Sequence, residues 1–205
     1  MKFARKMPST NNELSIQLKS EGWKKIKEPS NLFTTILFAL PFAFLTGGIV
    51  IAITYLLSPS LYNFINDEHG LRLTIRIDGL FIIFIFAILI FMLLHELIHA
   101  LLIPNVFQSN NTFWGINGVF GFVFTTEAIK KGRFLVISIM PYLILSICLP
   151  ILLATFGLLN SFIILLCLIN GMGSCVDFMN ICLIAFQVPN GCYIKNNGFE
   201  TYYKG

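Results

Sequence analysis

The sequence predicts an all-α integral membrane protein with about four transmembrane helices and a small β-hairpin or re-entrant segment between the second and third. Hydrophobic residues make up 56% of the 205 residues and charged residues only 12%, whereas soluble domains typically contain about 25% charged residues. Four apolar segments are long enough to cross a bilayer, which takes about 20 residues. A chain of 205 residues with four spans leaves no room for a separate soluble enzyme, so any chemistry must lie in or beside the membrane.

The four spans follow one another with connections of unequal length. We expect the spans at residues 32–57, 79–103, 134–159 and 161–188. The last two are predicted to form a tight helical hairpin, because Gly157 and Asn160 leave space only for a short turn. Residues 1–30 form a basic segment before the first span, and residues 189–205 form a tail after the fourth.

Lysine and arginine residues predict the orientation of the chain. Residues 1–30 contain seven of them, whereas residues 58–78, between the first two spans, contain two against three acidic residues. The next connection carries Lys130, Lys131 and Arg133. Because cytoplasmic connections are enriched in positive charge, we expect both termini in the cytoplasm. The same bias explains the formal net charge of +4, which therefore does not indicate a nucleic-acid partner.

A His-Glu-x-x-His motif lies within the second span, where each ionisable side chain is costly. His95 and His99 are four residues apart and share one face of a helix, so both imidazoles can bind one Zn²⁺ ion. Glu96 is expected to act on water as a catalytic base. The chain contains only three histidines, which makes a chance match less plausible than in a histidine-rich sequence.

A catalytic zinc ion usually has three protein ligands and one water molecule. Asp177 is the only carboxylate in the other spans, and we expect it to be the third ligand. Asn170, Gly173 and Ser174 precede it at spacings of three and four, so this stripe should face the second span. Asp177 could instead be hydrogen-bonded within small-residue packing. Asn170 is a candidate for stabilising an oxyanion, or equally for a hydrogen bond between helices.

The connection at residues 106–126 is rich in aromatic and β-branched residues and contains Gly115 and Gly121. This composition favours short strands with turns, and we predict a β-hairpin or re-entrant sheet beside the candidate site. Its edge could bind an extended substrate segment by strand addition. An aromatic anchor at the membrane interface explains the same composition equally well.

Together with this connection, three segments resemble a known family. They are HELIHA at 95–100, SIMPYLI at 138–144 and NGMGSCVDFMN at 170–180. Over roughly residues 80–188, the chain resembles the “putative zincin peptidase” family of multi-pass bacterial membrane proteins. That family is similar in outline to the site-2 intramembrane metalloproteases, in which a helix with the His-Glu-x-x-His motif pairs with a later helix that supplies an aspartate ligand.

The resemblance implies metal ligands at His95, His99 and Asp177, a catalytic base at Glu96, and a place in the bacterial cytoplasmic membrane. The chain departs from the site-2 proteases around Asp177. Their motif reads Asn-Pro-Asp-Gly or Leu-Asp-Gly, whereas the segment here reads Val-Asp-Phe. The histidines therefore match the pattern more closely than the aspartate does.

The sequence thus predicts a zinc-dependent intramembrane or membrane-associated endopeptidase, with residues 31–188 as its membrane metalloprotease-like domain. The expected partners are the lipid bilayer and a membrane protein or peptide substrate. The main alternative is a non-catalytic membrane protein, such as a partner-binding or immunity-type module, with a structural or vestigial metal site. The presence of Glu96 favours the enzyme, and a structural zinc site would need a fourth protein ligand.

Overall fold

The computed structural model describes residues 1–6, 8–66, 77–117 and 120–205. The chain divides into two compact units, which we describe separately. The first, here called the sheet unit, comprises Met1–Leu40, Glu96–Met140 and Val176–Gly205; the second, the helical unit, comprises Pro41–His95 and Pro141–Cys175. Charged residues between 67 and 76, which contributed to the predicted orientation, lie outside the described residues.

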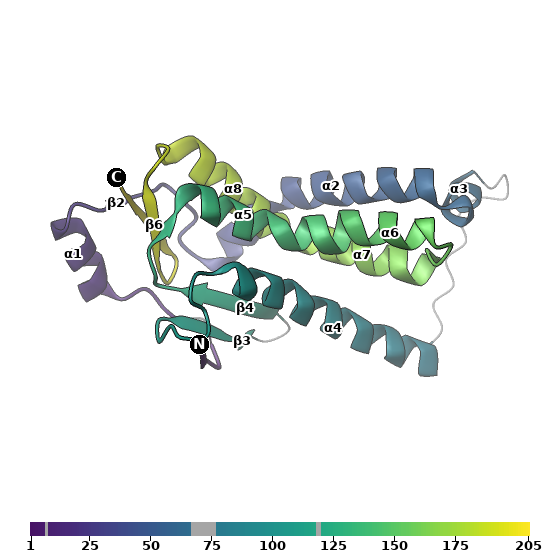
Figure 1. Ribbon diagram of the computed structural model, residues 1–205, viewed down its shortest axis with the longest axis horizontal. Coiled ribbons are helices and arrows are strands. Elements are labelled where there is room, and N and C mark those ends of the chain that lie inside the picture. Colours follow the sequence, from purple (N-terminus) through teal and green to yellow (C-terminus); the bar gives the residue numbers. More distant parts are fainter. Residues whose placement is uncertain (7, 67–76, 118–119) are drawn as a thin grey trace. The chain divides into compact units, whose positions relative to one another are not determined.

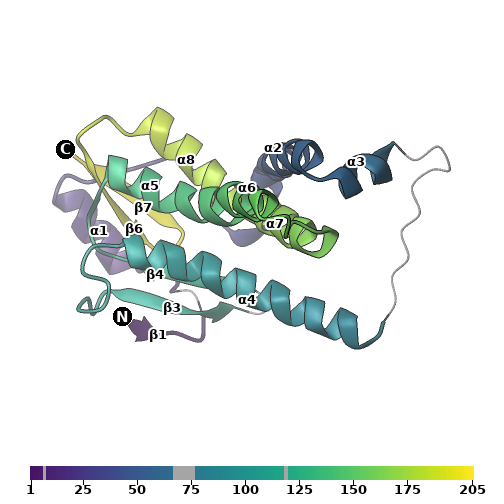
Figure 2. The ribbon, with the colours of Figure 1, turned by 45° about the vertical axis from the view of Figure 1, so that its right-hand side comes forward.

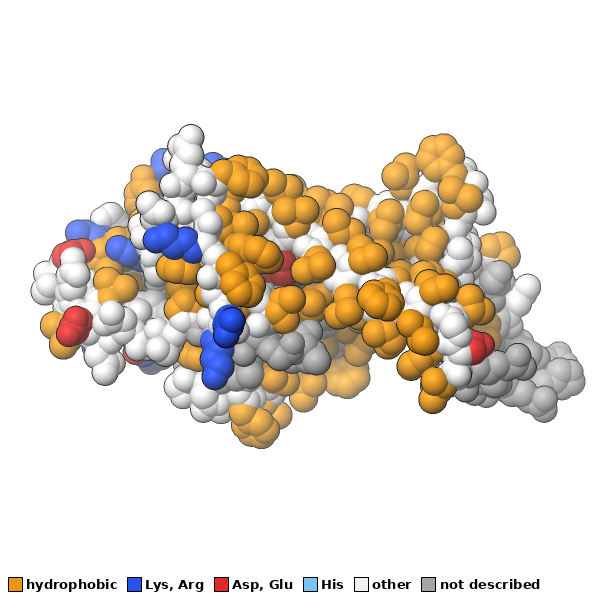
Figure 3. All heavy atoms as spheres, turned by 90° about the horizontal axis from the view of Figure 1, so that it is seen from below, with side chains coloured by type: hydrophobic (Ala, Val, Ile, Leu, Met, Phe, Trp, Pro, Cys, Tyr) orange, Lys and Arg blue, Asp and Glu red, His pale blue; other side chains and the backbone are white. Residues whose placement is uncertain are grey.

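Within the described residues, four helices are long and apolar enough to cross a membrane, and they correspond to the four predicted spans. They are α2 (Leu32–Leu57), α4 (Gly79–Leu102), the continuous helix Lys131–Thr155, and Ser161–Gln187, which contains α7 and α8. Hydrophobic side chains cover much of the long helices on the face shown in Figure 3. This apolar exterior is what a lipid environment requires, and it supports a membrane protein.

The third span is irregular where its prolines lie. It consists of α5 (Lys131–Tyr142), the π-helix η1 (Leu143–Cys148) and α6 (Leu149–Thr155). Pro141 lies inside α5 and Pro150 in the first turn of α6. Because proline has no N–H to donate, each one removes a bond from the helical ladder. Pro141 therefore leaves the carbonyl group of Ile137, four residues earlier, without its usual helical donor.

The fourth span is two helices rather than one. After Gly157, whose φ is +68°, the side chain of Asn160 accepts a hydrogen bond from the N–H of Ile163 and caps α7 (Ser161–Gly173). The chain then breaks at Ser174, whose hydroxyl donates to the carbonyl oxygen of Asn170, and continues as α8 (Cys175–Gln187). Asp177 therefore lies in the first turn of a new helix.

The predicted hairpin between the second and third spans is present as β3 (Thr112–Asn117) and β4 (Phe120–Thr125), which pair antiparallel. A short strand, β1 (Lys2–Phe3), adds to β3 in parallel, so the order of this sheet is β1-β3-β4. Gly115 permits this pairing, because an added Cβ would overlap the carbonyl oxygen of Ala4. Among the described residues, β1 and β4 are therefore the two outer strands of this sheet.

Figures 1 and 2 both show this hairpin running beside the C-terminal part of α4. Val123 of β4 packs against a buried cluster that includes Ala100 and Ile103. The hairpin is thus attached to the segment of α4 that follows the histidine motif.

The prediction of an all-α protein is correct only in part: the chain is mostly helical, but a second sheet contains four strands in the order β2-β7-β6-β5. They are β2 (Lys24–Lys25), β5 (Ile129–Lys130), β6 (Tyr193–Asn197) and β7 (Glu200–Lys204). The physical reason is a tight hairpin outside the apolar spans. Gly198 has a φ of +60° and occupies the first position of the two-residue turn between β6 and β7, where type II′ turns favour glycine.

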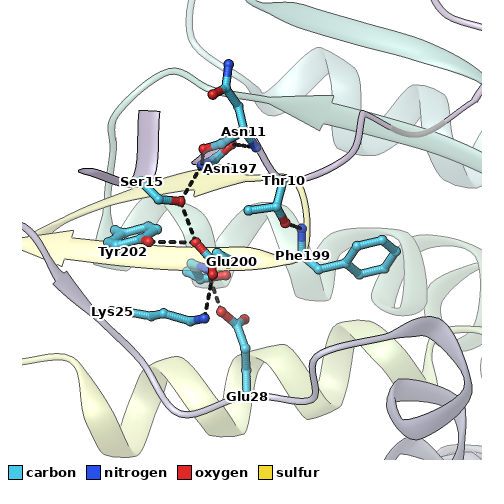
Figure 4. Close-up of polar contacts among 10 residues, drawn as sticks. Thr10, Asn11, Ser15, Lys25, Glu28, Asn197, Phe199, Glu200 and Tyr202 are labelled. Carbon is cyan, nitrogen blue, oxygen red and sulfur yellow. Dashed lines mark hydrogen bonds and ion pairs between the residues drawn. The ribbon is translucent and has the colours of Figure 1, made fainter. Parts of the chain in front are cut away.

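A short helix, α1 (Asn12–Ser20), is tied to this sheet by buried polar side chains. Asn197 accepts a hydrogen bond from the N–H of Asn11 and donates to the hydroxyl of Ser15, as Figure 4 shows. Glu200 accepts hydrogen bonds from Ser15, Tyr202 and Lys25 at 2.6, 2.6 and 2.7 Å. The segment before the first span and the tail after the fourth thus fold together.

Candidate metal centre

The histidine motif occupies the last two turns of α4, in which Ala100 is buried. Helix ends leave carbonyl groups without partners inside the helix. Here the guanidinium group of Arg133 supplies partners, since its Nε and Nη2 atoms donate to the carbonyl oxygen of Leu102 at 3.1 and 3.0 Å. This contact fixes the end of the helix that carries His95 and His99.

The two nitrogens of His99 face different groups within the sheet unit. Nδ1 lies 2.9 Å from the carbonyl oxygen of Ile137 in α5, and Nε2 lies 3.4 Å from Oδ1 of Asp177 in α8. A carbonyl oxygen can only accept, so Nδ1 carries a proton and donates it. In the neutral imidazole, Nε2 therefore has the lone pair, and it is this nitrogen that faces the aspartate.

His95 is oriented by a chain of hydrogen bonds in the helical unit. Its Nδ1 lies 3.0 Å from Oδ1 of Asn170, whose Nδ2 donates to Oγ of Ser146 at 2.9 Å. The hydroxyl of Ser146 donates its single proton to the carbonyl oxygen of Cys167 at 2.8 Å. Ser146 must therefore accept from Asn170, which turns the amide oxygen toward His95. It follows that Nδ1 of His95 also carries the proton and that Nε2 is its ligand nitrogen.

Asp177 lies in the first turn of α8, and the C-terminal end of that helix is stabilised by Lys131. The ammonium group of Lys131 donates to the carbonyl oxygens of Ala185 and Val188 and to Oδ1 of Asn190. Lys131 is buried, and three acceptors match its three N–H donors. α5 thus contributes one cation to the end of α4 and another to the end of α8.

His95, His99 and Asp177 each offer one ligand atom, and these atoms lie within 4.8 Å of one another. Two donors that each lie about 2.0–2.1 Å from a tetrahedral ion are roughly 3.3 Å apart, close to the 3.4 Å between His99 and Asp177. All three side chains are partly buried. Two imidazoles and one carboxylate suit Zn²⁺, so the residues fit the ion that the sequence predicts.

The other two predicted site residues lie beside this group. Glu96 is half-buried on α4 and is not among the grouped ligand atoms, which is consistent with a base rather than a ligand. Asn170 is buried, and both of its polar atoms are engaged, one by His95 and the other by Ser146. Its geometry therefore favours positioning of His95, which corresponds to the interhelical hydrogen bond that the sequence left open.

Four residues around the site were missed by the sequence analysis. They are Lys131, Arg133, Ile137 and Ser146. The two cations were interpreted as markers of orientation alone, although basic residues also stabilise the C-terminal ends of helices. No local pattern marks Ile137, because its contribution is a backbone carbonyl group.

Comparison with protein families places these observations in context. A family model described as “putative zincin peptidase” matches residues 88–193, which is just over half of the chain. The chain belongs to this family. The match contains the histidine motif, the hairpin and Asp177, and the zincin peptidase family implies a metallopeptidase that uses zinc. No curated protein and no solved structure matches the chain significantly.

Proposed function

We propose that this member of the zincin peptidase family is a zinc-dependent endopeptidase of the membrane, which hydrolyses peptide bonds in membrane-linked proteins. The observation that carries the proposal is the grouping of His95, His99 and Asp177 on helices long enough to span a bilayer. Intramembrane ionisable residues are expensive and usually functional. Three such residues whose ligand atoms lie close together therefore support a metal centre.

Zinc, when bound, supplies Lewis acidity that polarises a scissile carbonyl group and acidifies water. Glu96 directly follows the proposed ligand His95 on α4. In the proposed reaction, its carboxylate takes a proton from the attacking water and later delivers that proton to the leaving amine. Asn170 holds His95 in place during the reaction rather than contacting the substrate.

The edge of β4 is our proposed binding place for the substrate backbone. β4 is an outer strand of the described sheet, and with six residues it is longer than the other outer strand, β1, which has two. An extended peptide could add there through backbone hydrogen bonds. Strand addition also suits the chemistry, because a helical substrate segment has its peptide bonds enclosed in the helical ladder and must be extended before cleavage.

We further propose that both termini face the cytoplasm of a bacterial cell. Support comes from the four-stranded sheet, in which β2 precedes the first span, β5 precedes the third and β6 and β7 follow the fourth. These segments must lie on the same side of the membrane to pair. They are also the segments with the basic bias that marks the cytoplasmic side.

The proposal is tested with Glu96→Gln, which removes the base and keeps the side-chain size. Cells that express the wild-type chain or Glu96→Gln are compared by quantitative mass spectrometry of the new N-termini in their membrane proteins. We expect a set of termini that appears with the wild type and is at least tenfold weaker with Glu96→Gln. Identical termini in both cell lines, with equal amounts of folded and zinc-loaded protein, would contradict an endopeptidase.

One observation favours the non-catalytic alternative: the contact between His99 and Asp177 is also an ion-pair geometry. In that case the pair would stabilise the fold without a metal. The alternative predicts that Glu96→Gln and wild type give the same cellular output, whereas Asp177→Asn unfolds the chain or abolishes partner binding even when zinc is removed by a chelator.

A further inference from the structure

Pro141 lies inside α5, in the helix that packs beside His99. In a regular α-helix the carbonyl oxygen of residue 137 would accept a hydrogen bond from the N–H of residue 141. Proline has no such N–H. The carbonyl group of Ile137 therefore lacks its usual helical donor, which is costly inside a membrane, where no water replaces the lost bond.

The imidazole of His99 lies where it can donate to the carbonyl oxygen of Ile137 in place of the missing N–H. Its Nδ1 lies 2.9 Å from the Ile137 oxygen, a normal hydrogen-bond distance. Because the carbonyl can only accept, the bond selects the tautomer with the proton on Nδ1 and the lone pair on Nε2. Nε2 is the nitrogen that lies 3.4 Å from Asp177. The absent N–H of Pro141 is thus linked to the direction in which Nε2 of His99 points its lone pair.

We propose that Pro141 is a positioning residue of the metal centre, which leaves the Ile137 carbonyl to accept the Nδ1–H of His99 and so directs Nε2 to the metal. This inference rests on the proposed zinc site. A backbone carbonyl group that holds the second nitrogen of a metal-binding histidine commonly alters metal affinity by 10–100-fold when it is lost. An alanine at position 141 restores an N–H that would compete with His99 for the Ile137 oxygen and draw that oxygen into the helical ladder.

Pro41 provides a matched control. It also lies inside a membrane-length helix, α2, but that helix carries none of the three proposed ligands. Pro41→Ala and Pro141→Ala therefore make the same chemical change, a restored backbone N–H in an apolar helix. A general effect of removing a proline from a membrane-length helix would appear in both variants, whereas a positioning effect would appear only at residue 141.

The test measures the zinc dissociation constant of the detergent-purified full chain by competition with a chromophoric chelator, together with the absorption spectrum after substitution with Co²⁺. We expect Pro141→Ala to bind zinc about tenfold more weakly, with altered cobalt bands, and Pro41→Ala to match the wild type within about twofold. Equal affinity and equal spectra for Pro141→Ala and wild type would overturn the positioning role and leave the zinc site intact. Equal weakening in both variants would also overturn it. Failure of the wild type to bind zinc would overturn both proposals.

A second measurement needs no folded Pro141 variant. The wild-type chain has three histidines, so ¹⁵N NMR of zinc-loaded protein with labelled histidine can resolve each ring, with His99→Asn assigning the His99 signals. The inference requires a protonated Nδ1 and a zinc-bound Nε2 in His99. A zinc-bound Nδ1 with a protonated Nε2 would contradict it directly.

Discussion

Nε2 of His99 lies 3.4 Å from Oδ1 of Asp177, although 78 positions separate the two residues in the sequence. The distance fits two ligands of one tetrahedral zinc ion. It joins the end of α4 to the beginning of α8, so the proposed centre connects two membrane-length helices. Metal content is therefore the measurement that bears most directly on the site.

We expect the purified wild-type chain to contain about one zinc ion, as catalytic sites with three protein ligands do. His95→Ala and Asp177→Ala should each lose it, because two remaining ligands hold zinc weakly. Inductively coupled plasma mass spectrometry of the detergent-purified protein gives the stoichiometry. His69→Ala, which changes the third histidine and lies outside the described residues, is the control that should keep the metal. Zinc retained in Asp177→Ala would remove Asp177 from the ligand set.

Ser146→Ala tests the orientation of His95 through Asn170. Ser146 is fully buried and accepts from the Asn170 amide, so its loss leaves that donor unpaired and costs about 1–3 kcal/mol. Zinc affinity should fall several-fold as the amide turns. Thr54→Ala is the control, since it removes another buried hydroxyl that bonds only to its own helix. Equal zinc affinity in wild type and Ser146→Ala, by chelator competition, would argue against this relay.

Lys131→Met tests the cap of α8. The substitution keeps the apolar stem and removes the ammonium group, so the carbonyl oxygens of Ala185 and Val188 lose a charged donor. We expect a loss of about 1.5–3 kcal/mol in the free energy of unfolding. Thermal unfolding in detergent measures it, with exposed Lys130→Met as the control that should change stability little. A similar result for both lysines would mean that the cap contributes nothing specific.

The stability of the four-stranded sheet should fall in acid through Glu200. Burial on its own raises the pKa of this carboxyl group, but hydrogen bonds from Lys25, Ser15 and Tyr202 outweigh burial and lower its pKa from 4.5 to about 2. A lowered carboxyl pKa stabilises the fold above pH 4.5, and the contribution is lost as the pH falls from 4.5 toward 2. Trp23 fluorescence in a Trp114→Phe background follows this unfolding.

The two acidic side chains near Lys25 should respond in opposite directions. Glu200→Gln should remove the loss of stability that Glu200 causes below pH 4.5, because the carboxyl group with the lowered pKa is gone. Burial raises the pKa of Glu28, against the opposing hydrogen bonds from Thr201. A raised pKa favours the folded state in acid, so Glu28→Gln should make the acid-induced loss steeper. If the stability of the wild type and of Glu200→Gln fell equally with decreasing pH, Glu200 would not be the group responsible for the loss in acid.

The membrane helices could be predicted because their signal is strong and local. Uninterrupted apolar length gave four spans, and the spacing of His95 and His99 gave their shared face. The break at Ser174 was not predicted from the sequence, which indicates one span over residues 161–188. Here the hydroxyl of Ser174 shares the carbonyl oxygen of Asn170 with the N–H of Ser174 itself, a side-chain bond of the kind that bends helices.

The four-stranded sheet was missed because its strands are short, polar and distant in sequence. β2 and β5 contain two residues each, and no periodicity can be read from two residues. The hairpin of β6 and β7 did carry a signal, since Asn197 and Gly198 form a dipeptide that favours tight turns. Orientation of side chains such as Asn170 depends on a partner in another span, and sequence spacing does not encode that partner.

The position of β2 in the sheet has a consequence for biogenesis. The ion pair between Lys25 and Glu200 joins residues 175 positions apart, and all four membrane-length helices lie between them in the sequence. β2 cannot pair with β7 until the fourth helix and β7 have been synthesised, so this sheet is among the last parts to form. A chain whose helices insert with one omitted would leave β2 and β7 on opposite sides of the bilayer. Closure of the sheet thus requires an even number of membrane crossings between β2 and β7, so the pairing of the two strands detects the loss of any single helix from the membrane.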